Sequence, residues 1–144
     1  MLNRLARVFS SFESHEVRYV VIGGVAAVLH GVPRATYDLD ILIEASRENA
    51  EHLLAALSEA GFGTAFLTNP EDILSHQITI FKDYVRLDVQ TSTAGISFES
   101  AWQRRETMTI HGRQDLIASK RAAGREIDLR DAEILERGGK LSPP

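Results

Sequence analysis

The sequence predicts an α/β (α+β) fold, a mixed β-sheet with flanking helices. Segments with apolar residues at helical spacing alternate with short apolar runs of strand length. Two of these runs are separated by only two residues, as in a β-hairpin, so the sheet should combine antiparallel pairing with crossover connections. The length of 144 residues suits a single hydrophobic core.

The first part of the chain is predicted to contain two strands and three helices. In order, these are a helix over residues 2–14, a strand over 17–22, a short helix over 25–29, a strand over 39–43 and a helix from Ser46 to just before Gly61. Ser46 is a suitable N-cap because its hydroxyl oxygen can accept a hydrogen bond from a free backbone N–H. Glycines such as Gly31 and Gly61 are typical of helix ends.

The second part is predicted to contain a hairpin and several helices. Residues 61–70 should form a loop, 71–75 a single helical turn, 77–81 and 84–90 the two strands of the hairpin, and 98–105 a helix. A strand over 108–110 and helices over 114–122 and 127–137 follow. We predict one domain over residues 1–137, followed by a frayed Gly-Gly and Pro-Pro tail over 138–144.

Composition narrows the chemistry that the protein can perform. The absence of cysteine excludes disulfides, Cys-ligated zinc, iron–sulfur clusters and thiol catalysis. The histidines show no HxH or HExxH spacing; they are His15, His30, His52, His76 and His111. Any metal site should therefore be built from oxygen ligands, which favour a hard cation over zinc.

Charge and hydropathy predict a cytoplasmic protein that is not a general polyanion binder. The net charge is −4, and no apolar run has the length of a membrane span or a signal-peptide core. Residues 101–144 are mildly basic. That basic character is compatible with phosphate contacts and equally with a solvated helix face.

Two aspartates lie in or next to the apolar strand predicted over residues 39–43. Asp40 lies inside this strand, and Asp38 directly precedes it. Residues i and i+2 of a strand share a face, so Asp38 and Asp40 should project together. Leu39, Ile41 and Ile43 should face the core on the other side. Adjacent like charges raise each other's pKa, and a divalent cation between carboxylates relieves the repulsion. This pattern therefore indicates a metal site.

A third carboxylate lies in the second strand of the predicted hairpin, YVRLDVQ. The alternation puts Tyr84, Arg86, Asp88 and Gln90 on one face and Val85, Leu87 and Val89 on the other. If this strand lies beside the strand of Asp38 and Asp40, three carboxylates converge on one patch. The alternative is that they are edge-strand aspartates paired with Arg34 and Arg86.

A glycine pair precedes the carboxylate strand. Gly23-Gly24 should form the turn from strand to helix, where a ligand can approach the backbone and an anion can meet free amides. The pair belongs to neither a Walker loop nor a GxGxxG motif. Arg34 could hold a phosphate by two parallel hydrogen bonds or merely neutralise the aspartates. For His30, packing or capping and a functional role both remain open.

The stretch GGVAAVLHGVPRATYDLDILIE, residues 23–44, resembles the nucleotidyltransferase superfamily, whose fold is shared with the catalytic core of DNA polymerase beta. The closest resemblance is to AbiEii-like toxin nucleotidyltransferases and small uncharacterised relatives. It continues in RLDVQ and in LIASKRAAGREIDLRDAEIL, so it covers most of the chain. It implies a minimal nucleotidyltransferase fold.

The resemblance implies a role for particular residues. It identifies Asp38, Asp40 and Asp88 as catalytic metal ligands for Mg²⁺, and Asp88 also as the group that helps to activate the attacking hydroxyl. It identifies the residues that contact the nucleotide as Gly23, Gly24, Arg34, Thr36 and Lys120. Arg125 and Asp128 belong to the same pattern, or they pair with each other to hold the last two helices together.

The implied reaction is transfer of a nucleoside monophosphate from an NTP such as ATP to a hydroxyl, with release of pyrophosphate. The acceptor is left open between tRNA, a protein and a small molecule such as an antibiotic, with a toxin–antitoxin role expected from the AbiEii-like pattern. The GG and YDLDI motifs differ from the GS and SDIDL style of small antitoxin relatives. The longer toxin enzymes carry an additional helical domain, so a homodimer or a partner protein is one way to complete the cleft.

Two other functions compete with this one. A catalytically silent nucleotide-binding or regulatory module would keep the fold, but it would usually have lost one of the carboxylates. A DxD glycosyltransferase would also use paired aspartates on a nucleotide, but its nucleotide-binding region normally precedes the DxD motif by a longer segment than is present here.

Overall fold

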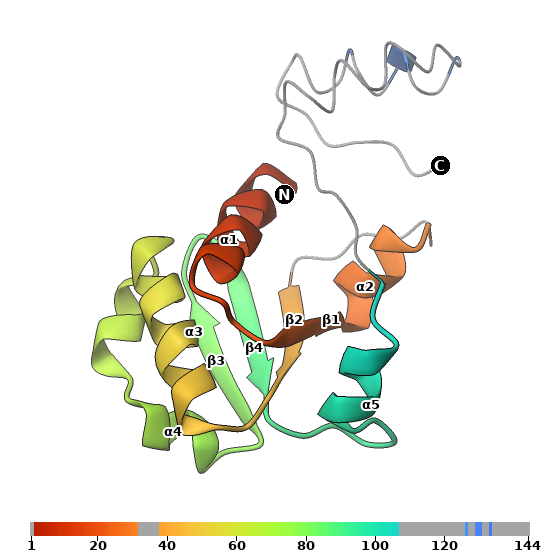
Figure 1. Ribbon diagram of the computed structural model, residues 1–144. Helices are drawn as coiled ribbons and strands as arrows, with labels where there is room; N and C mark the ends of the chain where they lie inside the picture. The colour runs from red at the N-terminus through yellow and green to blue at the C-terminus, as the bar shows by residue number, and fades with distance from the viewer. Residues whose placement is uncertain (1, 32–37, 107–125, 127–128, 131–132, 134–144) are drawn as a thin grey trace.

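The computed structural model describes residues 2–31 and 38–106, together with Glu126, Leu129, Arg130 and Glu133. Within this part a four-stranded sheet has the order β1-β2-β4-β3 (Figure 1). Its strands are β1 (Tyr19–Ile22), β2 (Asp38–Ile43), β3 (Ile78–Lys82) and β4 (Arg86–Gln90). β2 and β4 are parallel, while β1 and β3 pair antiparallel to their neighbours. The predicted mixed α/β sheet is confirmed.

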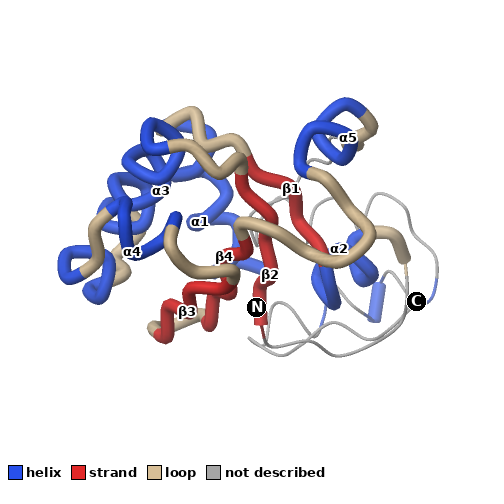
Figure 2. Tube along the Cα trace, turned by 90° about the horizontal axis from the view of Figure 1, so that it is seen from below, coloured by secondary structure: helices blue, strands red, loops and turns tan. Residues whose placement is uncertain are grey.

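Helices pack on the sheet from two sides. They are α1 (Leu2–Ser14), α2 (Gly23–Leu29), α3 (Arg47–Glu59), the 3-10 helix η1 (Gly63–Leu67), α4 (Pro70–Leu74) and α5 (Phe98–Gln103). α1 and α3 pack against each other and cover one face of the sheet. α2 and α5 lie beside β1, the strand at one edge of the sheet (Figure 2). Among the described residues, no helix is long and apolar enough to cross a membrane.

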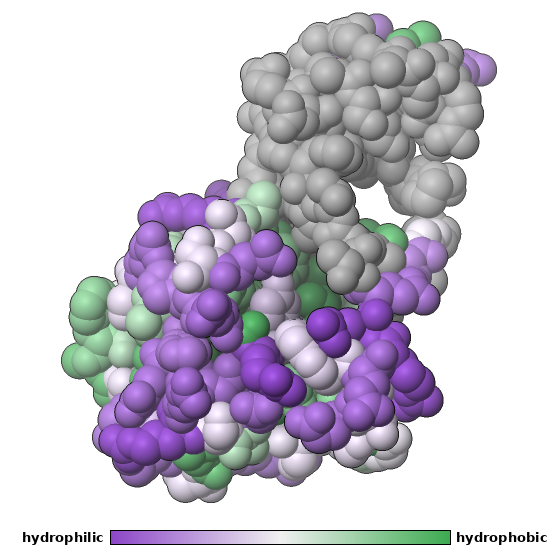
Figure 3. Space-filling model, viewed as in Figure 1, coloured by the Kyte–Doolittle hydropathy of each residue, from purple (hydrophilic) through white to green (hydrophobic). Residues whose placement is uncertain are grey.

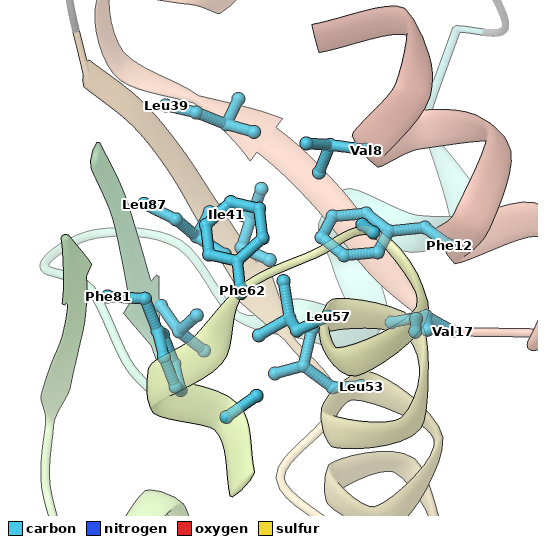
Figure 4. Packing of buried hydrophobic residues seen from close by; sticks show 14 of the residues in the cluster. Val8, Phe12, Val17, Leu39, Ile41, Leu53, Leu57, Phe62, Phe81 and Leu87 are labelled. Carbon is cyan, nitrogen blue, oxygen red and sulfur yellow. The ribbon is translucent and has the colours of Figure 1, made fainter. Parts of the chain in front are cut away.

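The core lies between α1, α3 and one face of the sheet (Figure 4). Leu39 and Ile41 of β2, Phe12 of α1 and Leu57 of α3 belong to this one cluster, and all four are fully buried. Val85, Leu87 and Val89 are buried as predicted, as are Leu39, Ile41 and Ile43. The alternation along both strands therefore directs the residues between these apolar positions to the opposite face.

The predicted N-cap at Ser46 is confirmed, because its Oγ accepts a hydrogen bond from the Asn49 N–H at 3.2 Å. Asn49 itself is almost completely buried, which the sequence did not suggest. Its Oδ1 accepts from the Arg18 N–H at 2.8 Å, and its Nδ2 donates to the carbonyls of Arg18 and Glu44, both at 2.9 Å. The side chain of Asn49 thus ties the start of α3 to the backbone just before β1 and just after β2.

The short helix after β1 differs from its prediction. α2 begins at Gly23 instead of at residue 25, so the glycine pair forms the first turn of the helix rather than a separate turn before it. The predicted loop over residues 61–70 contains η1, which places Ala65 in the core and leaves Phe66 and Leu67 exposed.

The prediction that Tyr84 shares a face with Arg86 and Asp88 is wrong. β4 begins only at Arg86, so Tyr84 lies in the turn of the hairpin and is not subject to strand alternation. Its ring packs against Phe62 with a centroid distance of 5.1 Å, and its hydroxyl donates to the Ala60 carbonyl at 2.6 Å. Tyr84 therefore stabilises the core side of the sheet.

Several predicted elements lie outside the described residues or touch them only at isolated positions. These are the strand over 108–110, the helices over 114–122 and 127–137, and the tail over 138–144. The single-domain boundary over residues 1–137 stays a prediction.

Candidate active site

The two central strands of the sheet carry the three aspartates. β2 and β4 are parallel neighbours, with Asp40 directly beside Asp88 and Asp38 directly beside Arg86. Because the adjacent residues of both strands face the core, Asp38, Asp40 and Asp88 lie on the opposite face, here called the acidic face. The alternative that they are edge-strand aspartates is wrong, since each strand is paired on both sides.

Arg86 binds two of the three carboxylates. Its Nε donates to Asp88 Oδ1 at 3.0 Å and its Nη2 to Asp88 Oδ2 at 3.5 Å, which forms a two-point ion pair. Nε also lies 3.9 Å from Asp38 Oδ2. The hydrogen bond and the negative charge of Asp88 raise the pKa of Arg86. The predicted pairing with Arg86 is therefore present, but in the centre of the sheet.

The negative charge of Asp40 is poorly compensated by the groups around it. Its pKa is raised, first by burial, then by the charges of Asp88 and Asp38 and by a side-chain hydrogen bond with Asp88. The positive charge of Arg86 lowers the pKa, but it does not offset these effects. The ionised form of Asp40 is consequently disfavoured, and a cation beside it would favour that form.

Gly23 lies directly against Asp40. Residue 22 at the end of β1 pairs with Asp40, and Gly23 follows with a φ of +69°. A Cβ built on Gly23 would lie 2.6 Å from Asp40 Oδ2, closer than real Cβ atoms come to such an atom. Glycine is therefore required here for its backbone conformation and for the space that Asp40 occupies. The predicted contact of Gly23 and Gly24 with a nucleotide stays a prediction.

The other predicted site residues lie outside the described residues. They are Arg34, Thr36, Lys120, Arg125 and Asp128. His30 is exposed at the end of α2, and its Nδ1 lies 3.8 Å from Glu106 Oε2. This contact is a weak surface pair.

The donor chemistry of the acidic face fits a hard metal ion, because three carboxylates are available on adjacent strands. Within the described part of the chain, however, no three carboxylate or histidine side chains are gathered as ligands around one point. Arg86 lies against Asp88 and Asp38 instead. The arrangement is that of carboxylates bound to an arginine.

A groove with a volume of about 1370 Å³ runs along β1, between α1 and the ends of α2 and α5. None of the three aspartates lines it. Its charged lining combines the glutamates Glu13, Glu16 and Glu48 with the arginines Arg18, Arg104 and Arg105. The face of the molecule seen in Figure 3 is largely hydrophilic. No local sequence pattern predicts this groove, because it is built from residues far apart in the chain.

Residues 4–125 match the model of the aminoglycoside-2''-adenylyltransferase family, which is of nucleotidyltransferase type. No curated protein and no solved structure matches the chain. The match bears out the superfamily and nucleotidyl transfer as the general chemistry, whereas the closer resemblance to AbiEii-like toxins stays a prediction. Since the match covers most of the sequence, the chain belongs to the aminoglycoside-2''-adenylyltransferase family.

Proposed function

We propose that the protein transfers the adenylyl group of ATP, in a Mg²⁺-dependent reaction, to a hydroxyl of an aminoglycoside. The observation that carries the proposal is the juxtaposition of Asp40 and Asp88 on the two central strands, with Asp38 on the same face. The family match over residues 4–125 supports the adenylyl group and the aminoglycoside.

In this proposal Asp38, Asp40 and Asp88 hold Mg²⁺. The chemistry that Mg²⁺ supplies in such a site is a lower pKa for the acceptor hydroxyl and neutralisation of the triphosphate and pyrophosphate charge. The acceptor oxygen forms a bond to the α-phosphorus while the bond from that phosphorus to pyrophosphate breaks. Asp88, whose side chain is 16% exposed against 46% for Asp38, is proposed to accept the hydroxyl proton.

The nucleotide contacts follow from the resemblance of the sequence and are part of the proposal. Gly23 and Gly24 are assigned to the triphosphate, because the first turn of α2 brings backbone without side chains next to Asp40. Arg34, Thr36 and Lys120 are assigned to the nucleotide as predicted. The protein's main contributions are alignment and charge, as is general for phosphoryl transfer.

The charge of the molecule favours a cationic acceptor over a nucleic acid. The net charge is −4, and among the described residues five glutamates line the groove beside β1 against three arginines. Aminoglycosides are polycations, so such a surface raises their local concentration, whereas it repels the phosphates of tRNA. A cytoplasmic location, where ATP is available, and a homodimer or partner protein that completes the cleft remain parts of the proposal.

The test is a transfer assay with α-phosphate-labelled ATP, Mg²⁺ and aminoglycosides with and without a free 2''-hydroxyl. We expect labelled AMP–aminoglycoside adducts and one pyrophosphate per adduct, only with acceptors that have the hydroxyl. Labelled tRNA or protein instead would overturn the aminoglycoside and favour the toxin-like role, while keeping nucleotidyl transfer. No labelled product, and no ATP binding by the folded protein, would favour the catalytically silent module.

A further inference from the structure

Arg86 occupies a special position on the acidic face. It lies beside Asp38 in the register of β2 and β4 and two residues before Asp88, so all three side chains share one face. The strand β3 adds one more cation to this face, Lys82, which is the neighbour of Arg86 on the other side. Lys82 makes no ion pair with another described residue, whereas Arg86 contacts two aspartates.

The contacts of Arg86 use oxygen atoms that a metal ion would need. Both carboxylate oxygens of Asp88 face N–H groups of Arg86, at 3.0 and 3.5 Å, and Asp38 Oδ2 lies 3.9 Å from Nε. A carboxylate has further lone pairs, but a guanidinium and a divalent cation on the same group repel each other. A metal ion at Asp88 and Asp38 would therefore compete with Arg86 for these oxygen atoms.

Arg86 is the partner that can move. Its side chain is 40% exposed, while that of Asp88 is 16% exposed. Swinging the arginine into solvent leaves no buried cation behind, and its long side chain allows this without a change in the backbone. Asp88 is held more closely in the sheet. An incoming cation should therefore displace Arg86 and bind Asp88 where it stands.

We propose that Arg86 is a positioning residue that makes metal binding depend on the nucleotide; this inference rests on the proposed function. A metal ion alone must displace Arg86 from Asp88 and Asp38, so it binds weakly. With a triphosphate present, the displaced guanidinium has new anionic oxygens to pair with, and guanidinium groups match phosphate oxygens well. The metal and the nucleotide then bind as one complex, with Arg86 as the coupling element.

The test is calorimetric titration of wild type and Arg86→Gln with Mn²⁺ alone and with preformed Mn·ATP. Without Arg86 the guanidinium no longer competes for the oxygens of Asp88, so Mn²⁺ alone should bind at least about 5-fold more tightly. Mn·ATP should bind at least about 5-fold more weakly, because the phosphates lose a partner. If Arg86→Gln raises the affinity for Mn²⁺ and lowers the affinity for Mn·ATP, the two ligands are coupled through Arg86.

Lys82→Gln removes one positive charge from the neighbouring position and is the matched control. It should change either affinity by less than about 2-fold, as expected for an exposed charge. Arg86→Lys keeps the charge near Asp88 and should resemble wild type for Mn²⁺ alone. As a check on folding, Arg86→Gln should have a lower Tm without metal, and Mn²⁺ should raise this Tm more than that of wild type.

The inference is overturned if Arg86→Gln binds Mn²⁺ alone no more tightly than Lys82→Gln does. If wild type still binds Mn·ATP in that case, only the role of Arg86 is wrong and the proposed function stands. If neither wild type nor Arg86→Gln binds Mn²⁺ or Mn·ATP, the metal-dependent function fails together with it.

Discussion

Asp40→Asn is expected to reduce nucleotidyl transfer by at least about 10³-fold while making the folded protein slightly more stable at neutral pH. The loss of activity follows from removing one metal-binding carboxylate, which contributes several kcal/mol to the transition state. The gain in stability follows from removing a charge that burial, Asp88 and Asp38 all disfavour. A gain of up to about 1 kcal/mol is expected for relieving like charges on neighbouring strands.

The gain in stability of Asp40→Asn over wild type should increase with pH. The pKa of Asp40 in the folded state is raised above its usual value of 3.8, so the folded protein holds the proton to higher pH than the unfolded chain does. Asp40 therefore contributes stability below its unfolded pKa, and this contribution is lost as the pH rises through its folded pKa. The advantage of Asp40→Asn should thus be small near pH 4 and should grow toward about pH 7.

Urea denaturation of wild type and Asp40→Asn across this pH range measures the effect. Asp88→Asn is the informative comparison, because it should lose activity as well but should lower stability. It removes the carboxylate that accepts two hydrogen bonds from Arg86. If Asp40→Asn were less stable than wild type at neutral pH, or retained most of its activity, the assignment of Asp40 as an unbalanced metal ligand would be wrong.

Gly23→Ala is expected to lower transfer by about 10²-fold or more, since small displacements of catalytic groups have effects of this size. The new Cβ would lie 2.6 Å from Asp40 Oδ2, so the carboxylate or the first turn of α2 must shift. The φ of +69° adds backbone strain of about 1–3 kcal/mol for a residue other than glycine. Both the metal ligand and the proposed phosphate contact are disturbed by one methyl group.

Gly95→Ala is the control that separates the backbone strain of Gly23→Ala from its contact with Asp40. Gly95 has a φ of +77°, and a Cβ there would meet nothing within 4 Å. The two variants should therefore lose similar stability to backbone strain, but only Gly23→Ala should lose activity and Mg·ATP affinity. Thermal unfolding and a transfer assay on both variants decide this. Equal activities for Gly23→Ala and Gly95→Ala would remove Gly23 from the site.

The acidic face was predictable in part because strand alternation is a local property. Asp38, Asp40 and Asp88 each sit among apolar residues of short strands, which fixed the face to which they point. The pairing of Asp40 with Asp88 is a tertiary fact, since β2 and β4 are separated by α3, η1, α4 and β3. The sequence alone therefore predicts that the three aspartates converge only on the condition that the two strands are neighbours.

Other features depended on contacts that no local pattern encodes. Asn49 follows an N-cap in an ordinary helix start, yet its side chain bridges the backbone of Arg18 and Glu44. Tyr84 fits the alternation of YVRLDVQ, but the hairpin turn extends to residue 85 and redirects its ring to the core. The sequence predicts a ligand contact for Gly23, and the structure adds a second reason for glycine at this position, because a Cβ there would meet Asp40.

Calorimetric titration of ATP with and without Mg²⁺, on wild type and on Asp38→Asn/Asp40→Asn, tests whether the acidic face binds the metal and nucleotide for nucleotidyl transfer. The readout is the gain in affinity that Mg²⁺ produces, because removing two negative charges can strengthen metal-free ATP binding on its own. We predict a large Mg²⁺-dependent gain for wild type and none for the double variant. A gain that survives in the folded double variant, or no ATP binding by folded wild type, would contradict nucleotidyl transfer at the acidic face.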